Sequence, residues 1–304
     1  YFNHRFKELK KTWMKTKEGP FGTHKVQHCF HRIEFQHRGS PHVHMIVWLE
    51  NAPKYNPDIE SSQDIIDFVD SIITTTSDDP DLEKLIKYQY HKCTSTCTKT
   101  VRGKNSCRFG APFPPMDHTR IIKPLPDDYE MTAEKSSEVR DFIKNMKDLL
   151  DSNCSLSFNE FLVQLGVSID EYVFMISSQL KNTKIFLKRS PKDCRINQYN
   201  KKILMLMRSN IDVQFVLDPY SCVQYIVDYI NKSQRGLSRL MKACIDNVNQ
   251  GNLSVREKLK AVSNTLYNGS EISAQEAAWC RLQLQMSCSS VAVAVSYTHL
   301  RAHE

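Results

Sequence analysis

The sequence predicts an α+β fold, in which strands and helices are segregated along the chain rather than strictly alternating. Three observations support this prediction. Two short runs rich in β-branched and aromatic residues lie near the start, amphipathic helical patterns dominate from residue 132 onward, and no repeat or low-complexity segment is visible. With 40% hydrophobic and 25% charged residues among 304, the composition is that of a folded globular protein and excludes disorder as the main state.

The two β-rich runs cover residues 29–36 and 42–49, and the Gly and Pro in the intervening residues 37–41 predict a turn and hence a hairpin. Side chains alternate along a strand, so His42 and His44 in the second run point to one face. Two neutral imidazoles side by side are a start for a divalent metal site. Glu34 or Gln36, which share a face of the first run, can lie beside them. A His-x-His pair taken alone is also typical of ordinary surface or core histidines.

Helical spacing of apolar residues predicts one helix over 132–150, two more within 155–180 and another over 222–233. Between the last two regions, residues 213–217 are β-branched and aromatic, which predicts a short strand.

The helix predicted over 222–233 carries Tyr225 and Tyr229 on one face, with Lys232 three residues further along it. Tyrosine pairs at this spacing usually serve packing. Next to a metal ion, however, a phenolate can attack a phosphodiester, and Lys232 can stabilise the phenolate or the phosphate. Catalysis and packing both remain open from spacing alone.

Three of the ten cysteines are clustered, and a histidine lies close to them. His91, Cys93, Cys97 and Cys107 offer one imidazole and three thiols, enough for a closed tetrahedral Zn²⁺ site. The alternative is a set of free thiols on a flexible basic loop. The other seven cysteines are scattered and are expected to be buried thiols, as in an intracellular protein.

Charge is distributed unevenly along a chain whose net charge is +7. Residues 58–83 contain nine acids and no Lys or Arg, whereas residues 84–110 contain seven Lys or Arg and no acid. The basic segment is the expected contact surface for nucleic-acid phosphates, although the acidic half reads as an ordinary solvated helix. Its candidate phosphate contacts are Lys99, Arg102, Lys104 and Arg108. No apolar run approaches the roughly 20 residues of a membrane span, so no membrane partner is expected.

Several motifs in one order resemble the replication-initiator (Rep) domain of Helitron transposases, which belongs to the HUH nucleases, named for a His-hydrophobic-His motif. The matching segments are Glu34-Phe35-Gln36-His37-Arg38-Gly39-Ser40-Pro41-His42-Val43-His44, Cys107-Arg108-Phe109-Gly110, Ile196-Asn197-Gln198-Tyr199-Asn200, Asn210-Ile211-Asp212, Tyr225-Ile226-Val227-Asp228-Tyr229-Ile230-Asn231-Lys232 and Ile272-Ser273-Ala274-Gln275-Glu276-Ala277. The resemblance covers most of residues 1–288.

The resemblance implies a single-stranded DNA endonuclease and strand transferase of a rolling-circle transposon. It implies an antiparallel HUH/Rep-type sheet flanked by helices, with an inserted zinc-finger-like segment. His42 and His44 would bind Mg²⁺ or Mn²⁺, with Gln36 preferred to Glu34 as third ligand because Gln36 lies nearer the turn. Tyr225 and Tyr229 would be the nucleophiles, forming a 5′-phosphotyrosine link. The cell nucleus is the expected location in a eukaryotic host.

The same resemblance divides the chain into five expected regions. These are the hairpin part of the nuclease domain (1–55), an acidic helical insertion (56–90), the zinc-finger-like segment (91–115), the remainder of the domain with the tyrosine helix (116–288) and a tail that resembles translated adapter sequence (289–304). The chain is expected to begin inside a longer protein. A helicase domain is expected in the full-length protein, but no Gly-x-x-x-x-Gly-Lys-Ser/Thr loop occurs in these residues.

Two other classes of function remain open from the sequence. The first is a catalytically inactive, transposon-derived DNA-binding module that keeps the basic surface and the zinc site. The second is a zinc-dependent hydrolase that uses the His pair, which would form no covalent DNA adduct and would need a third strong ligand.

Overall fold

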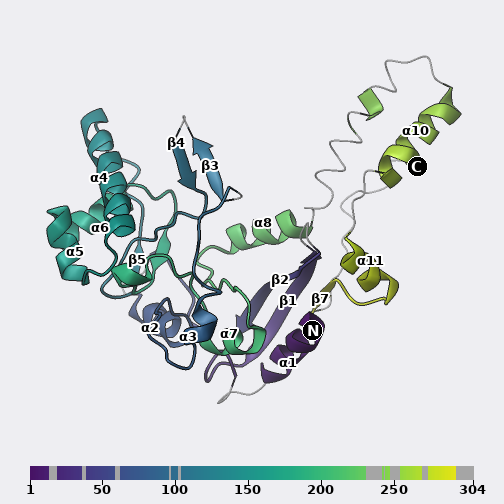
Figure 1. Cartoon of the computed structure of the whole chain (residues 1–304), viewed down its shortest axis with the longest axis horizontal. Coiled ribbons are helices and arrows are strands. Elements are labelled where there is room, and N and C mark those ends of the chain that lie inside the picture. The colour runs from purple at the N-terminus through teal and green to yellow at the C-terminus, as the bar shows by residue number, and fades with distance from the viewer. Residues whose placement is uncertain are drawn as a thin grey trace. The chain divides into compact units, whose positions relative to one another are not determined.

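The computed structural model (Figure 1) describes residues 1–13, 19–35, 39–58, 62–95, 97–101, 104–230, 242, 244–246, 254–268 and 273–291. The chain divides into two compact units. Unit 1 comprises residues 1–25 and 51–217, and unit 2 comprises residues 26–50 and 218–304. The hairpin and the tyrosine helix therefore belong to unit 2, whereas the Cys/His cluster belongs to unit 1.

Unit 1 is mainly helical and carries two small two-stranded sheets. Its elements are α1 (Phe2–Thr12), α2 (Gln63–Ile72), α3 (Glu83–Ile86), β3 (Thr98–Val101), β4 (Lys104–Cys107), β5 (Arg120–Ile122), α4 (Ala133–Ser152), α5 (Phe158–Leu165), α6 (Ile169–Ser177), β6 (Lys184–Phe186), η1 (Pro191–Asp193) and α7 (Lys201–Met207).

Unit 2 is built around a three-stranded sheet with strand order β2-β1-β7. Its elements are β1 (Val26–Phe35), β2 (Pro41–Leu49), α8 (Pro219–Ile230), α10 (Val255–Asn268), α11 (Ala274–Arg281) and β7 (Ser287–Ser289). Helix α8 contacts β1. Every strand pair in the described residues is antiparallel, so the predicted α+β class and the predicted hairpin are confirmed.

The helices of unit 1 begin and end where local side chains satisfy the free backbone groups. Ser157 and Ser168 each accept a hydrogen bond from the backbone N–H three residues later and form a capping box, so they begin α5 and α6. Gly166 ends α5 in the left-handed conformation, with φ +69°, which glycine adopts without strain. The helices predicted over 132–150 and 155–180 are therefore present.

The main core of unit 1 lies between α4, α5 and α6, which group together in Figure 1. Val139, Phe142 and Met146 form the buried stripe of α4, at the spacing that predicted the helix. Tyr172 is fully buried against this stripe and donates its hydroxyl hydrogen bond to the Pro115 carbonyl at 3.1 Å. Burial raises the pKa of the Tyr172 phenol far above its usual range, so this hydroxyl stays a neutral donor.

The strand predicted over 213–217 was wrong. These residues have no regular structure, although their burial alternates. Val213 and Phe215 pack against the cluster formed by α2 and Leu187, whereas Val216 is exposed. The alternating pattern therefore comes from an extended segment that covers a hydrophobic cluster without pairing with a neighbouring strand.

The seven scattered cysteines are reduced, but most of them are not buried. Cys194 is buried, Cys154 and Cys280 are exposed, and the remaining four are partly buried. The expectation of buried thiols was wrong for these six, because a small thiol is tolerated at the surface as well as in a core.

Among the described helices, none is long and apolar enough to cross a membrane.

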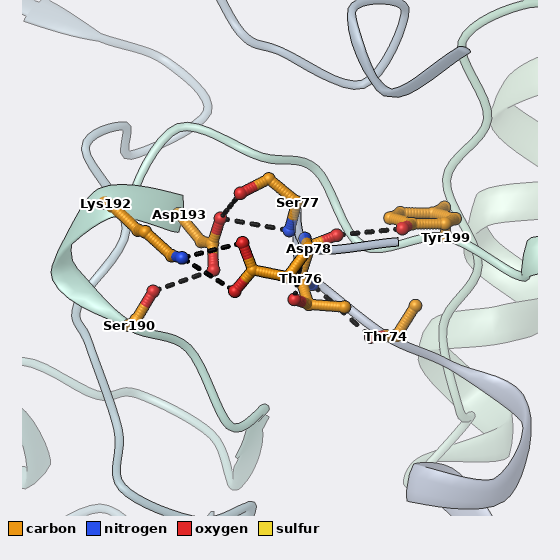
Figure 2. Close-up of polar contacts among 8 residues, drawn as sticks. All are labelled: Thr74, Thr76, Ser77, Asp78, Ser190, Lys192, Asp193 and Tyr199. Atoms are coloured by element: carbon orange, nitrogen blue, oxygen red, sulfur yellow. Dashed lines mark hydrogen bonds and ion pairs between the residues drawn. The ribbon is translucent and has the colours of Figure 1, made fainter. Parts of the chain in front are cut away.

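A buried carboxylate joins two distant segments of unit 1 (Figure 2). Asp193 is 3% exposed and accepts hydrogen bonds from the backbone N–H of Ser77 at 3.1 Å, from the Ser77 hydroxyl and from the Ser190 hydroxyl at 2.7 Å. The neighbouring Arg189 donates to the carbonyl oxygens of Asp193 and Ile196, at 2.8 and 2.5 Å. Burial lowers the pKa of Arg189 to about 10, which still leaves it protonated at neutral pH. This network holds residues 74–78 against residues 189–199.

Replacing Asp193 with alanine should lower the free energy of unfolding by about 2–4 kcal/mol, because buried donors lose their acceptor and a buried Arg189 loses a nearby negative charge. Denaturant unfolding measures this loss. The matched control is Asp78→Ala in the same segment, whose exposed ion pair with Lys192 should contribute little. Equal effects of the two substitutions would contradict the structural role of Asp193.

Candidate functional site

The β1–β2 hairpin brings two histidines and a carboxylate to one face of the sheet. Residues 28–35 pair one-to-one with residues 41–48, so Glu34 lies opposite His42 and Arg32 lies opposite His44. Directly opposed residues of an antiparallel pair project to the same face, and so do residues two apart on one strand. The imidazole rings of His42 and His44 lie with their centroids 4.8 Å apart.

The turn of this hairpin depends on Gly39, which adopts φ +74°. A side chain at this conformation is strained. A Cβ atom at Gly39 would also lie 2.0 Å from Oε1 of Gln275 in α11, so the turn and the helix approach closely. Phe35, at the end of β1, packs edge-on against Trp279 of the same helix, with ring centroids 5.6 Å apart. Helix α11 thus supports the end of β1 that carries Glu34.

Helix α8 supplies the third component of the site. Asp218 accepts hydrogen bonds from the backbone N–H groups of Tyr220 and Ser221, at 3.0 and 3.1 Å, and Pro219 occupies the first helical position. The hydrogen bond from the Ser221 hydroxyl, together with these backbone N–H groups, lowers the pKa of the Asp218 carboxyl. Tyr225 follows on the next turns of this well-capped helix.

His44 connects Tyr225 to Glu34. The Tyr225 hydroxyl lies 2.7 Å from Nδ1 of His44, and Oε2 of Glu34 lies 2.8 Å from Nε2 of the same ring. The His44 side chain is 9% exposed, whereas Tyr225 is 43% exposed. The phenol therefore joins a buried imidazole at one end and remains open to solvent over much of its ring.

Three residues predicted for the site around His42 and His44 fall wholly or partly outside the described residues. Gln36 and Lys232 lie outside them, and the backbone of Tyr229 belongs to α8 while its side chain is not described. Of the two alternatives for the third ligand, the described structure brings Glu34 to the His pair. The preference for Gln36 stays a prediction.

Two further charged residues, Arg32 and Glu276, lie near this site, and the sequence patterns assigned a role to neither. Arg32 shares the face of Glu34 and His44 through the strand register. Burial raises the pKa of Glu276 in α11; Arg32 opposes this effect and Glu34 adds to it, so Glu276 lies near both. The alternation along β1 would have identified Arg32, whereas Glu276 depends on a long-range contact.

The donor set suits a divalent cation. Imidazole nitrogens and a carboxylate oxygen on one face are ligands for Mn²⁺ and related ions, and a carboxylate is preferred by Mg²⁺. Nε2 of His44 and Oε2 of Glu34, now hydrogen-bonded to each other, would both be able to turn toward a common ion. An ion would take Nε2 of His44, because the Tyr225 hydroxyl contacts the other ring nitrogen, Nδ1.

The second candidate site lies in unit 1, at the base of the β3–β4 hairpin. The side chains of His91, Cys93, Cys97 and Cys107 converge, with their ligand atoms all within 4.8 Å of one another. Sγ of Cys93 lies 3.6 Å and Sγ of Cys107 lies 3.2 Å from Nε2 of His91. A zinc tetrahedron with the usual bond lengths has nitrogen–sulfur edges of about 3.5 Å. The predicted cluster is therefore assembled and could hold a metal such as zinc.

The surroundings of this cluster favour the protonation state that binds a metal at His91 and at Cys107, but not at Cys93. Burial, and then the charge of Arg195, lowers the pKa of His91 and keeps its imidazole neutral. Burial tends to raise the pKa of Cys107, but hydrogen bonds from the backbone of Phe109 and Ala111 and from the side chains of Cys93 and Cys97 together lower the pKa. Burial raises the pKa of Cys93, against the effect of Arg195. Metal ligation requires the thiolate, so Cys107 is the best-prepared thiol.

Arg195 anchors the cluster to the helical core. Its backbone carbonyl accepts a hydrogen bond from the His91 N–H at 2.7 Å, and its Nη1 lies 3.7 Å from Sγ of Cys93. Nη2 of Arg195 pairs with Asp151 of α4 at 2.5 Å. Burial would lower the pKa of Arg195, but the hydrogen bonds to Asp151 and Cys93 and the charges of these two groups together raise the pKa. The guanidinium therefore remains charged beside Cys93.

The predicted phosphate contacts lie on and beside the same hairpin. Lys99 and Arg108 are exposed. Arg102 lies outside the described residues, and Lys104 belongs to β4 with a side chain that is not described.

Comparisons of the chain with protein-family models, with curated proteins and with solved structures find no match.

The purified protein should bind about one Zn²⁺ per chain at the Cys/His cluster, measured by elemental analysis after dialysis. Cys97→Ser should remove this metal and lower the midpoint of thermal unfolding, because a ligand that stabilises the hairpin is lost. The control is Cys154→Ser, an exposed thiol outside the cluster, which should keep the metal. Retention of zinc by Cys97→Ser would contradict the site.

Proposed function

We propose that this protein cleaves single-stranded DNA by a metal-assisted attack of Tyr225, as a nuclease and strand transferase of a rolling-circle transposon. The observation that carries the proposal is the meeting of Tyr225 with His44, at 2.7 Å, on the sheet face that also presents His42 and Glu34. The resemblance of the sequence motifs to the Helitron Rep domain supports the same chemistry. The substrate, the enzyme class and the HUH-type fold belong to this proposal.

His42, His44 and Glu34 would hold a Mg²⁺ or Mn²⁺ ion. When bound, this ion supplies positive charge that polarises the scissile phosphate. Nε2 of His44 would exchange its hydrogen bond with Glu34 for this ion, while Nδ1 of His44 orients the Tyr225 hydroxyl. Arg32, on the same face, adds positive charge for an anionic substrate.

The proposed reaction exchanges one phosphodiester for another. The Tyr225 oxygen attacks the phosphorus, its proton passes to solvent, and the bond from phosphorus to the 3′-oxygen breaks. The 3′-oxygen takes a proton and leaves as a free hydroxyl, while the 5′ end remains linked to Tyr225. The energy of the broken ester is kept in the phosphotyrosine, so a later 3′-hydroxyl can reverse the reaction and join a strand. Tyr229 and Lys232 remain predicted participants in this chemistry.

Exposure of Tyr225 fits a macromolecular substrate. A half-exposed phenol beside the buried His44 is open to a polymer that lies across the surface, and its hydroxyl is the end that the scissile phosphate must reach. A helicase domain in the full-length protein and a nuclear location are further parts of the proposal.

Incubation with Mn²⁺ and a single-stranded oligonucleotide should produce a covalent protein–DNA species that survives denaturing electrophoresis. Tyr225→Phe should reduce this species to background, because the substitution removes the nucleophilic oxygen and leaves the ring in place. Tyr220→Phe is the matched control, since Tyr220 is an exposed tyrosine on the same helix, and it should leave the adduct unchanged.

Tyr229→Phe tested in parallel would assign the second tyrosine. An adduct that persists in Tyr225→Phe but disappears in Tyr229→Phe would move the nucleophile to Tyr229. Absence of an adduct from the unmodified protein, with zinc bound and DNA binding intact, would favour the inactive DNA-binding module. A cleaved strand without any covalent species would favour a hydrolase.

Glu34→Ala should raise the Mn²⁺ concentration needed for half-maximal adduct formation by roughly 10- to 100-fold, because an oxygen ligand of the ion is lost. The measurement is a titration of adduct yield against Mn²⁺. Glu138→Ala, which removes an exposed partner of Lys135 in unit 1, serves as the control. An unchanged titration curve for Glu34→Ala would exclude Glu34 as a ligand.

A further inference from the structure

Exposed aromatic side chains gather around the Cys/His cluster of unit 1. Phe109, just after β4, is 54% exposed, and Tyr90, just before His91, is 52% exposed. Tyr88 lies two residues before Tyr90 and is also exposed. Among the described side chains between residues 87 and 109, the exposed large apolar ones are all aromatic. Exposed rings that are close together in one segment, rather than scattered singly, indicate a surface that receives a ligand.

These rings are held in place although they face solvent. The Arg108 guanidinium lies over the Phe109 ring, 4.6 Å from its centroid, and the His91 ring packs edge-on against Phe109 at 5.4 Å. Nζ of Lys87 lies 5.4 Å from the centroid of Tyr88. The backbone of Tyr90 forms a bridge with Ile196. Because the rings are already ordered, a flat ligand that stacks on them loses little additional side-chain entropy.

The chain segment that carries these rings is rich in cations. Lys87, Lys92, Lys99 and Arg108 lie in a segment, residues 84–110, that contains no acidic residue. Aromatic rings interleaved with cations offer a stacking face and a phosphate contact at the same time. A duplex keeps its bases inside the stack, so the rings suit a strand with unpaired bases.

We propose that this surface, formed by Tyr88, Tyr90, Phe109 and their neighbouring cations, binds single-stranded DNA by stacking unpaired bases on the rings of Phe109 and Tyr90. The choice of DNA as the strand rests on the proposed function; the stacking itself rests on the exposed rings and their cations. This surface belongs to unit 1, whereas the Tyr225 site belongs to unit 2, so the surface would bind the strand without cutting it.

The test measures binding of a fluorescent oligo(dT) by anisotropy. It uses the whole zinc-loaded chain with the substitution Tyr225→Phe, so that no cleavage occurs. In this background, Phe109→Leu should weaken binding by a factor of roughly 5 to 100, since leucine keeps apolar volume but has no ring face. Phe109→Trp should bind at least as tightly as phenylalanine. Tyr90→Ala should weaken binding in the same range.

The matched control is Tyr129→Ala, an exposed tyrosine of unit 1 that packs against Phe174 away from the cluster, and it should leave the affinity unchanged. An abasic oligonucleotide should bind weakly, and with equal affinity, to the chain that keeps Phe109 and to the Phe109→Leu variant. Zinc content is measured in each variant, and a weakened variant supports the proposal only with its zinc retained.

Three results would overturn the proposal. They are equal oligo(dT) affinity in Phe109→Leu and Phe109→Trp, equal affinity for abasic and base-containing strands, or tighter binding to an RNA strand of matching sequence. Cleavage is scored separately by the covalent adduct. Stacking can therefore fail while the adduct forms, and the adduct can be absent while stacking is intact, so the two proposals fail distinguishably.

Discussion

The one-to-one antiparallel register of β1 and β2 is the constraint on which the candidate catalytic site depends. It sets Glu34 opposite His42 and Arg32 opposite His44, and thereby gathers four functional groups on one face. A slip by one residue would turn every side chain of one strand to the other face. The single irregularity in the pairing lies between Val26 and His28, at the far end of the hairpin from the turn. The register beside the histidines is therefore regular.

Local patterns in the sequence predicted the elements whose causes are local. The capped helices α5 and α6 begin at serines that bond to the next turn, and their apolar spacing matches the buried face. The hairpin followed from two β-rich runs and a turn that needs Gly39. The Cys/His cluster followed from ligand types within a short stretch of chain, since residues 91–107 can reach one another whatever the rest of the fold does.

Distant contacts could not be read from the same patterns. Tyr225 meets His44 across 181 residues, and spacing says nothing about that approach; the family resemblance alone suggested it. The preference for Gln36 over Glu34 relied on nearness to the turn, whereas the ring position of His44 places Glu34 at bonding distance. Val213 and Phe215 led to the prediction of a strand that is not present. Side chains are buried alternately in an extended segment just as they are in a paired strand.

The two candidate sites acquire their rigidity by different means. The hairpin of unit 2 is long, pairs with β7 on its other edge and is contacted by α8, so its ligands are placed by the sheet itself. The β3–β4 hairpin has strands of only four residues, and an isolated pair of this size is marginal in water. Its base is tied by Arg195 to Asp151, and ligation of an ion by residues on both sides of the hairpin would close it. Phe109 packs on His91, so the position of the exposed ring follows from the Cys/His cluster beside it.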